Sequence, residues 1–232
     1  LSTFNTSNVK DMKYMFDNCN SLKYLDISNF DCSQLTHPIS FFNNLEKLQF
    51  IYLSGINLSH ITDISFMFYN LKSLQSLDFP NIDTSSVINM KYLFSNCNKL
   101  KSLNLSNLNT SNTEYMNGMF LNCISLTELN LSNFITDKVK DITSMFQNCA
   151  QLNYLNLSNF NTSNVLYMTH LFDNCNQLKT IDLSSFDTKL VENFTSLFRN
   201  CNELTSLDLS NFRIDNLKIS TNLEVIFKGC TK

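Results

Sequence analysis

Glycine, proline and charged residues are scarce in this sequence. The 232 residues include only 3 Gly and 2 Pro, which excludes collagen-like and linker-like sequence because both need these residues in large numbers. Charged residues make up 16%, the formal net charge is −3 and no basic run occurs, so we expect no nucleic-acid partner. No apolar run approaches the roughly 18 residues that cross a bilayer, so we expect no membrane span in this segment.

A repeat of 26 residues runs through the chain. Its marker is the tetrapeptide Phe-x-Asn-Cys, and we take the Cys position as the anchor of each repeat. The anchor cysteines are Cys19, Cys97, Cys123, Cys149, Cys175 and Cys201. The gap from Cys19 to Cys97 is three repeats long, and Leu45 and Leu71 fill the two intervening anchors. A period of 26 lies within the range of leucine-rich repeats.

The two halves of the repeat differ in hydrophobic period. Positions six and eight after the anchor are apolar, as at Leu129 and Leu131, and this alternation predicts a short strand with positions five and seven outward. Later in the repeat the spacing becomes three, three and one, which predicts the apolar stripe of a short helix. That stripe is Val165, Met168, Leu171 and Phe172 in one repeat. Acidic residues in the expected first turn suit the positive end of a helix dipole. They are Asp11, Asp63, Glu114, Asp141 and Glu192.

These patterns predict an α/β leucine-rich-repeat solenoid. We expect residues 1–232 to form a single solenoid, with a parallel sheet of about eight short strands and short helices on the other side. The last repeat is irregular, because Phe227 to Cys230 arrives three residues late. A solenoid end without a polar cap exposes its core, so we expect the full gene product to continue beyond Leu1 and Lys232.

Two recurrent positions of the repeat, each forming a column along the solenoid, could be interpreted as functional but have a structural explanation. The residue before each anchor is Asn, and Gly229 takes its place in the last repeat. Because both residue types tolerate left-handed backbone angles, the column predicts a helix C-terminal cap. The alternative is a ladder of asparagine amides that binds a ligand. The anchor accepts Leu as well as Cys, and no C-x-x-C pair occurs. We therefore expect buried free thiols and no metal at the anchors Cys97, Cys123, Cys149, Cys175 and Cys201. Cys32 replaces a recurrent Thr, and exposure of its side chain to solvent remains an open alternative.

Position seven is polar and lies on the outward side of the expected strand. It reads Asp26, Tyr52, Asp78, Asn104, Asn130, Asn156, Asp182 and Asp208. Asp182 and Asp208 would be neighbouring like charges about 4.8 Å apart, which a bound calcium would relieve; the alternative is a solvated ladder with shared protons or water. We expect no cofactor. The three histidines His37, His60 and His170 do not repeat and form no catalytic pattern, so we expect no enzyme activity.

The assembled repeat resembles a known family. Cys-x-x-Leu-x-x-Leu-Asn-Leu-Ser-Asn-Phe, followed by Thr-Ser-Asn-Val and Met-x-x-Met-Phe, is similar to BspA-like leucine-rich-repeat surface proteins, in particular to the 26-residue branch of mycoplasma-type surface lipoproteins. The resemblance covers the whole chain. It implies a cell-surface or secreted protein, adhesion or protein binding by the concave sheet face, and no catalytic residues.

A binding module and a structural spacer make different demands on the surface. A spacer that only projects another domain needs no special repeat, whereas a binder breaks the regularity at surface positions. Position five carries small or polar residues in most repeats, but Tyr24 and Phe50 occupy it in the first two, and Tyr52 replaces the usual Asp or Asn at position seven. We expect these three aromatics to form a site for a protein partner, with host surface or matrix proteins as candidates. The alternative is local drift in a decaying repeat, since Tyr154 occurs alone at position five among polar neighbours. The Asp182–Asp208 pair is the second candidate site.

Overall fold

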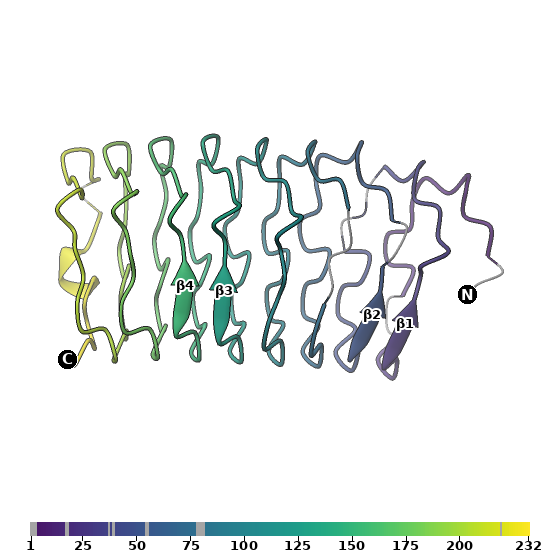
Figure 1. Cartoon of the computed structure of the whole chain (residues 1–232), viewed down its shortest axis with the longest axis horizontal. Helices are drawn as coiled ribbons and strands as arrows, with labels where there is room; N and C mark the ends of the chain where they lie inside the picture. The colour runs from purple at the N-terminus through teal and green to yellow at the C-terminus, as the bar shows by residue number, and fades with distance from the viewer. Residues whose placement is uncertain are drawn as a thin grey trace.

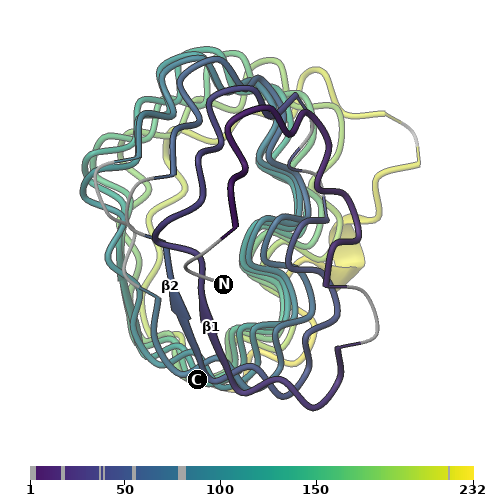
Figure 2. The same ribbon diagram turned by 90° about the vertical axis from the view of Figure 1, so that its right-hand side faces the viewer.

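Each 26-residue repeat forms one coil, and successive coils lie side by side along the long axis of the molecule (Figure 1). The computed structural model describes residues 4–16, 19–36, 38, 40–53, 56–77, 82–218 and 220–232. Asn18, His37 and Asp78, to which the sequence assigns roles, lie outside these residues. Seen from one end, each coil is a closed loop with two long sides (Figure 2). The predicted repeat solenoid is confirmed.

The strand side of the coils contains four short parallel strands in the described residues. The strands are β1 (Tyr24–Asp26), β2 (Phe50–Tyr52), β3 (Glu128–Asn130) and β4 (Tyr154–Asn156). β1 pairs with β2 and β3 pairs with β4, both in parallel, with each position opposite the same position of the next coil. A parallel bridge also joins Thr180 to Ser206.

The expected sheet of about eight strands is not continuous in the described residues, which form two two-stranded sheets. A turn closes just before each strand, as when Leu152 N–H donates to the Cys149 carbonyl at 3.0 Å. A second turn begins at position seven, as described below. About three residues per coil are therefore left for extended pairing, the length of each of the four strands.

The predicted helices are wrong. The second half of the coil is a series of turns, and the only helix in the described part of the chain is the short 3-10 helix η1 (Leu223–Val225). In one coil, three alternate N–H groups close turns onto the carbonyl three residues back. These bonds are Met145 to Ile142, Gln147 to Ser144 and Cys149 to Phe146, at 3.1, 3.2 and 3.1 Å.

The other N–H groups of this half bond to the next coil instead. They include Ile142 to Tyr167, Ser144 to Thr169, Phe146 to Leu171 and Asn148 to Asp173, at 3.0, 2.9, 3.1 and 2.8 Å. Left-handed residues at Ser144 (φ 56°) and Asn148 (φ 62°) turn alternate N–H groups outward along the solenoid axis. A helix would use all of these donors within itself, so the choice of inter-coil bonds excludes it.

On both long sides of the coil, backbone hydrogen bonds therefore join each repeat to the next. The spacing between neighbouring coils is then the same on the two sides. Helices about 10 Å wide on one side would force the array to curve around strands about 4.8 Å apart. With ladders on both sides this mismatch is absent, and Figure 1 shows a nearly straight row of coils. The face that was expected to be concave therefore has little curvature along the solenoid. We call the surface formed by positions five and seven the strand face.

The core consists of identical residue types stacked from coil to coil. One column is a ladder of phenylalanine rings whose centroids lie between 5.3 and 5.8 Å apart. Its members are Phe42, Phe68, Phe94, Phe120, Phe146, Phe172 and Phe198. Near-parallel rings at this separation add dispersion and quadrupole attraction to the burial of each side chain.

Five of the anchor cysteines form a second buried column, as predicted; the anchor Cys19 is exposed. Cys97, Cys123, Cys149, Cys175 and Cys201 are all buried free thiols. Burial raises the pKa of Cys123 to about 12, so this thiol stays protonated and unreactive at neutral pH. Cys32 is also buried, at 1% exposure, so the exposed position left open for it is excluded.

The asparagine column forms a side-chain ladder and caps no helix. Its described members from Asn44 to Asn200 all have φ between 57° and 63°, which confirms the expected left-handed backbone. The amide of each donates to the Oδ1 of the previous coil at 2.6–2.8 Å in five of these steps. The alternative interpretation of this column was a ligand-binding ladder. In the structure the asparagine amides hydrogen-bond mainly to one another.

Candidate interaction face

Strand alternation separates a polar outer row from the core. In β1 and β3 the central residue is buried and its two neighbours are exposed, so Leu25 and Leu129 point inward while positions five and seven face solvent. Because all paired strands keep the same register, each outward position forms a straight row along the solenoid. The strand face is built from these two rows.

The polar residues at position seven close a turn in most of the described coils. The side-chain oxygen accepts a hydrogen bond from the backbone N–H two residues on, at 2.8–3.1 Å, in six coils. The residues are Asp26, Asn104, Asn130, Asn156, Asp182 and Asp208. This Asx turn ends the strand and bends the chain into the next side of the coil.

The second candidate site, Asp182 and Asp208, takes part in these turns. The side chain and backbone N–H of Ser184 lower the pKa of Asp182, and the backbone N–H and side chain of Ser210 lower that of Asp208. Each carboxylate is therefore stabilised as an anion by its own turn. In the described part of the chain no group of three or more His, Cys, Asp or Glu side chains could hold a metal ion.

Asx turns recur at two more corners of the coil and account for other acidic and amide residues. At position twelve the acceptors include Asn109 and Asp187, and at position eighteen Asp63 and Asp141. Asp63 and Asp141 were expected at helix N-termini. Their observed role explains why Asp and Asn interchange at these positions.

The three predicted aromatics lie on two neighbouring strands. The rings of Tyr24 and Phe50 stack with centroids 5.4 Å apart and planes 9° from parallel. Tyr52 lies two residues beyond Phe50 on β2, on the same outward side. Tyr24 is 60% and Tyr52 57% exposed. Tyr52 cannot accept the hydrogen bond that position seven makes in other coils, so turn formation gives no reason for its presence.

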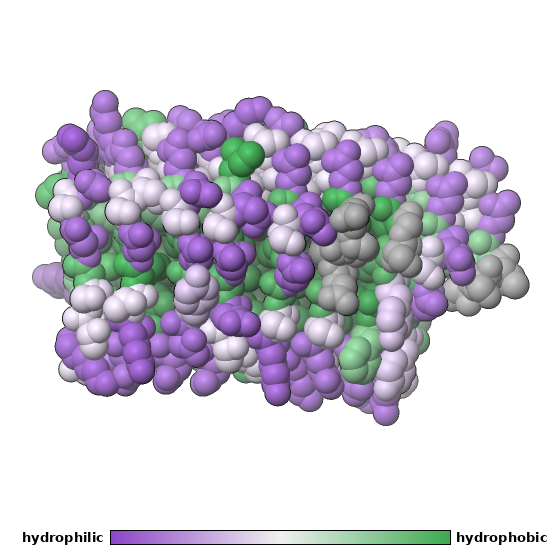
Figure 3. Space-filling view, in the orientation of Figure 1, coloured by the Kyte–Doolittle hydropathy of each residue, from purple (hydrophilic) through white to green (hydrophobic). Residues whose placement is uncertain are grey.

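Sequence reasoning missed a trough that begins beside these aromatics. One hollow of about 310 Å³ is lined by position-five side chains, with Tyr154 at one end, and a second of about 500 Å³ reaches Phe50. The two share Ser76 and Ser102. Figure 3 shows hydrophobic residues recessed between rows of hydrophilic ones on this side. The signal in the sequence was the pair of small serines at position five between two larger aromatics.

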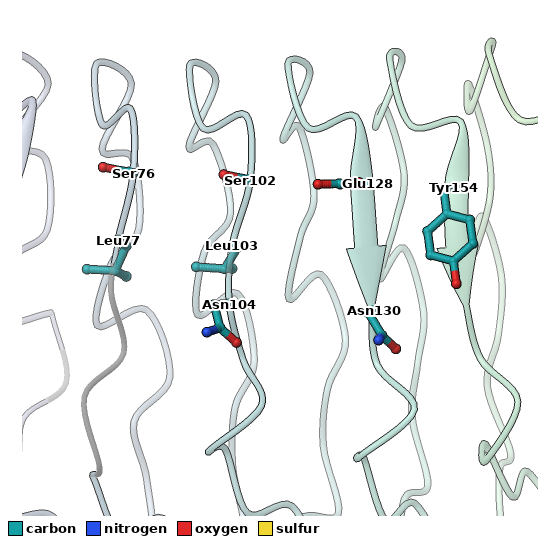
Figure 4. Close-up of a pocket in the computed structure, with 8 residues that line it drawn as sticks. All are labelled: Ser76, Leu77, Ser102, Leu103, Asn104, Glu128, Asn130 and Tyr154. Atoms are coloured by element: carbon teal, nitrogen blue, oxygen red, sulfur yellow. The ribbon is translucent and has the colours of Figure 1, made fainter.

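Figure 4 shows the part of the trough nearer Tyr154. Ser76, Ser102 and Glu128 lie in one row with Tyr154, and Asn104 and Asn130 lie in a second row beside it. Leu77 and Leu103 stand between the rows; both side chains are almost fully buried and form the floor. A polar wall, an apolar floor and an aromatic end are features of surfaces that bind other molecules.

A buried polar cluster lies away from the strand face. Asp173 is fully buried and accepts two bonds from Arg199, at 2.9 and 2.6 Å. His170 Nδ1 and the Gln147 amide each lie 3.0 Å from Asp173 Oδ2. His60 instead contacts the Leu35 carbonyl through Nε2 at 2.6 Å. Both described histidines thus have partners within the coil framework.

The sequence matches the family described as "Mycoplasma protein of unknown function, DUF285" over residues 1–75, 39–153 and 122–232. No curated protein matches the chain. Within the described residues, no helix is both long and apolar enough to cross a membrane.

Three solved structures are similar to the chain. The first is a leucine-rich repeat protein from Eubacterium ventriosum, 18% identical over 84% of this chain and 47% of that protein, with a TM-score of 0.48. The second is a T. pallidum leucine-rich repeat protein, 20% identical over 73% and 71%, with a TM-score of 0.49. The third is a Bacteroides ovatus leucine-rich repeat protein, 18% identical over 87% and 77%, with a TM-score of 0.28. The chain spans 47%, about half, of the Eubacterium ventriosum protein.

Proposed function

Because the chain belongs to the Mycoplasma family of unknown function, DUF285, and its repeats resemble those of BspA-like leucine-rich-repeat proteins, we propose that it is a protein-binding module. Its binding surface is the strand face, and it acts by adhesion or recognition without catalysis. The proposal includes a location on a cell-surface or secreted protein, which the resemblance to BspA-like surface proteins supports. Its partner is then a protein met outside the cell, such as a host surface or matrix protein.

The observation that carries this proposal is the exposed stack of Tyr24 on Phe50 beside Tyr52. Two of the three rings are more than half exposed, although the core and the turns of the coil do not need them. Exposed aromatics cost free energy in water and recover it when a partner covers them, which is why Tyr is enriched at interface hot spots. A spacer has no use for such a cluster.

The polar columns support binding rather than catalysis. The asparagine ladder and the Asx turns use their side chains to hold neighbouring coils and corners together. Asp173 is held by Arg199, His170 and Gln147 and is fully buried. Rigid repeat arrays offer an extended surface, and partner choice then depends on the few exposed side chains that depart from the repeat.

The test is a triple substitution of Tyr24, Phe50 and Tyr52 to Ser. Host surface and matrix extracts are passed over the immobilised wild-type protein, and any captured protein is purified and titrated against the variant. We expect a loss of at least tenfold in affinity, since hot-spot aromatics contribute about 2 kcal/mol or more. Circular dichroism checks that the variant is folded.

The matched control is Tyr167→Ser, because Tyr167 is an exposed tyrosine in the bridge column of the opposite side. Equal affinity of the folded triple variant and the wild type would move the site elsewhere. Failure of every extract to yield a partner that binds the purified chain would favour the spacer role.

A further inference from the structure

The trough beside the aromatics carries a charge of one sign along one wall. Lys99 and Lys101 line the hollow that reaches Phe50, and both are exposed. Neither has a carboxylate within ion-pair distance in the described part of the chain, where the lysine ion pairs involve other residues. Lys23 and Lys47, in the first two coils, are also exposed; Lys23 is at the repeat position of Lys101 and Lys47 at that of Lys99.

On the other side of the shared serines, the described residues Asn104 and Asn130 line the trough with uncharged amides. Asn104 and Asn130 close their turns through Oδ1, which leaves their NH₂ groups as donors. Among the described residues that line the two hollows, Glu128 is the one carboxylate, and it lies towards Tyr154. The part of the trough nearer Phe50 therefore attracts anions.

The dimensions of the trough suit an extended chain. Phe50 and Tyr154 occupy the same position four repeats apart, so about 19 Å separates them at about 4.8 Å per coil. An extended polypeptide covers that length with about six residues. The apolar floor of Leu77 and Leu103 suits a side chain of such a segment, and the asparagine NH₂ groups suit its backbone carbonyls.

We propose that this trough binds an extended acidic segment of the partner protein. Carboxylates of the segment pair with Lys99 and Lys101, and an aromatic or apolar side chain lies on the floor between Phe50 and Tyr154. The inference rests on the proposed function and adds the chemistry of the partner. Complementary charge of this kind sets specificity and association rate more than total affinity.

The test measures binding of fluorescent polymers by anisotropy at low and moderate salt. The probe is a random copolymer of glutamate and tyrosine, and the comparison polymers are polyglutamate, a lysine–tyrosine copolymer and heparin. The variants are Lys99→Gln, Lys101→Gln, Glu128→Gln and Tyr154→Ser. Lys179→Gln is the matched control, because Lys179 is an exposed lysine at the same repeat position as Lys101 but outside the trough.

We expect the glutamate–tyrosine copolymer to bind best, with each trough lysine variant weakening it about threefold at low salt. The same variants flatten the salt dependence, because each removes one screened charge pair. Glu128→Gln tightens binding, since it removes the one repulsive carboxylate. Tyr154→Ser weakens the tyrosine-containing copolymer more than polyglutamate.

Three outcomes overturn the inference. The glutamate–tyrosine copolymer does not bind, or Lys179→Gln weakens its binding as much as the trough variants do. The third is that heparin binds more tightly than the copolymer and Tyr154→Ser leaves heparin binding unchanged. The last outcome would make the surface a general polyanion site. If a captured partner still depends on Tyr24, Phe50 and Tyr52 while these polymer results fail, only this inference is lost. If neither the partner nor the polymer depends on the strand face, the proposed function is lost as well.

Discussion

Replacing Asn148 with alanine tests the finding that the asparagine column is a ladder between coils. Asn148 donates to Asn122 Oδ1 at 2.6 Å and accepts from the Asn174 amide at 2.7 Å. Its φ of 62° lies in the left-handed region, which alanine adopts at a cost of about 1 kcal/mol. Losing two hydrogen bonds costs a further ~1–3 kcal/mol. We expect Asn148→Ala to lower the free energy of unfolding by about 2–4 kcal/mol.

The order of the glycine and alanine variants separates backbone strain from hydrogen bonding. At an ordinary strand or helix position Gly is less stable than Ala by about 0.5–1 kcal/mol. At Asn148 we expect the reverse order, because Gly accepts a left-handed backbone without a side-chain clash. Both variants remain less stable than the wild type, since neither restores the ladder.

A double-mutant cycle distinguishes the ladder from a helix cap. Asn122 and Asn148 lie in different coils, so caps would contribute independently, whereas ladder partners couple by about 0.5–1.5 kcal/mol. Urea unfolding followed by circular dichroism gives the four free energies, with equal m-values as the check on two-state behaviour. Strict additivity of the two alanine variants would refute the ladder as a source of stability.

Other parts of the coil make separate predictions. Gly118→Ala should lower stability by about 1–3 kcal/mol, because φ is 63° and the new Cβ would collide with the Tyr92 ring; adding Tyr92→Ala should recover only part of the loss in the same urea assay. Arg199→Met should cost about 2–3 kcal/mol by leaving Asp173 buried with too few donors, and thermal unfolding would contradict this if the melting temperature were unchanged. Burial raises the pKa of Cys123 to about 12, so mass spectrometry after maleimide treatment of the native protein should find this residue unmodified, and rapid modification would show that the column opens.

The period and the inward columns could be predicted because they follow from composition at fixed spacing. Leu129 and Leu131 alternate as a strand requires, and both are buried. The buried thiols could also be predicted, because a site that accepts Leu45 as well as Cys is apolar. Such inferences depend only on which side of the backbone a residue faces.

The helix was mispredicted because consecutive turns produce the same spacing. Val165, Met168 and Leu171 recur every three residues and are all buried, as a helical stripe would be. In the structure this spacing comes from turns with a left-handed residue at His170, φ 57°. No Gly or Asn marks that position in this coil, so the sequence carried no local signal for the left-handed angle. The Asp/Asn-x-Ser pattern of the corners was readable as Asx turns and was missed.

The candidate site was only partly accessible to sequence reasoning. The aromatics at Tyr24 and Phe50 could be placed together because they share one repeat position in adjacent coils. The small serines at position five indicated a low stretch of the surface, but the depth of the trough could not be inferred, since it depends on how far Ser76 and Ser102 leave the floor uncovered between larger neighbours. Depth is a property of packed side chains rather than of residue order.

The most direct test of the central claim is hydroxyl-radical footprinting of the chain alone and with its captured partner. If the strand face is the binding surface, oxidation of Tyr24, Tyr52 and Tyr154 falls on binding, while that of Tyr167 on the opposite side is unchanged. All four tyrosines are exposed in the free protein, so each can report protection. Protection of Tyr167 with full oxidation of the other three would contradict the account.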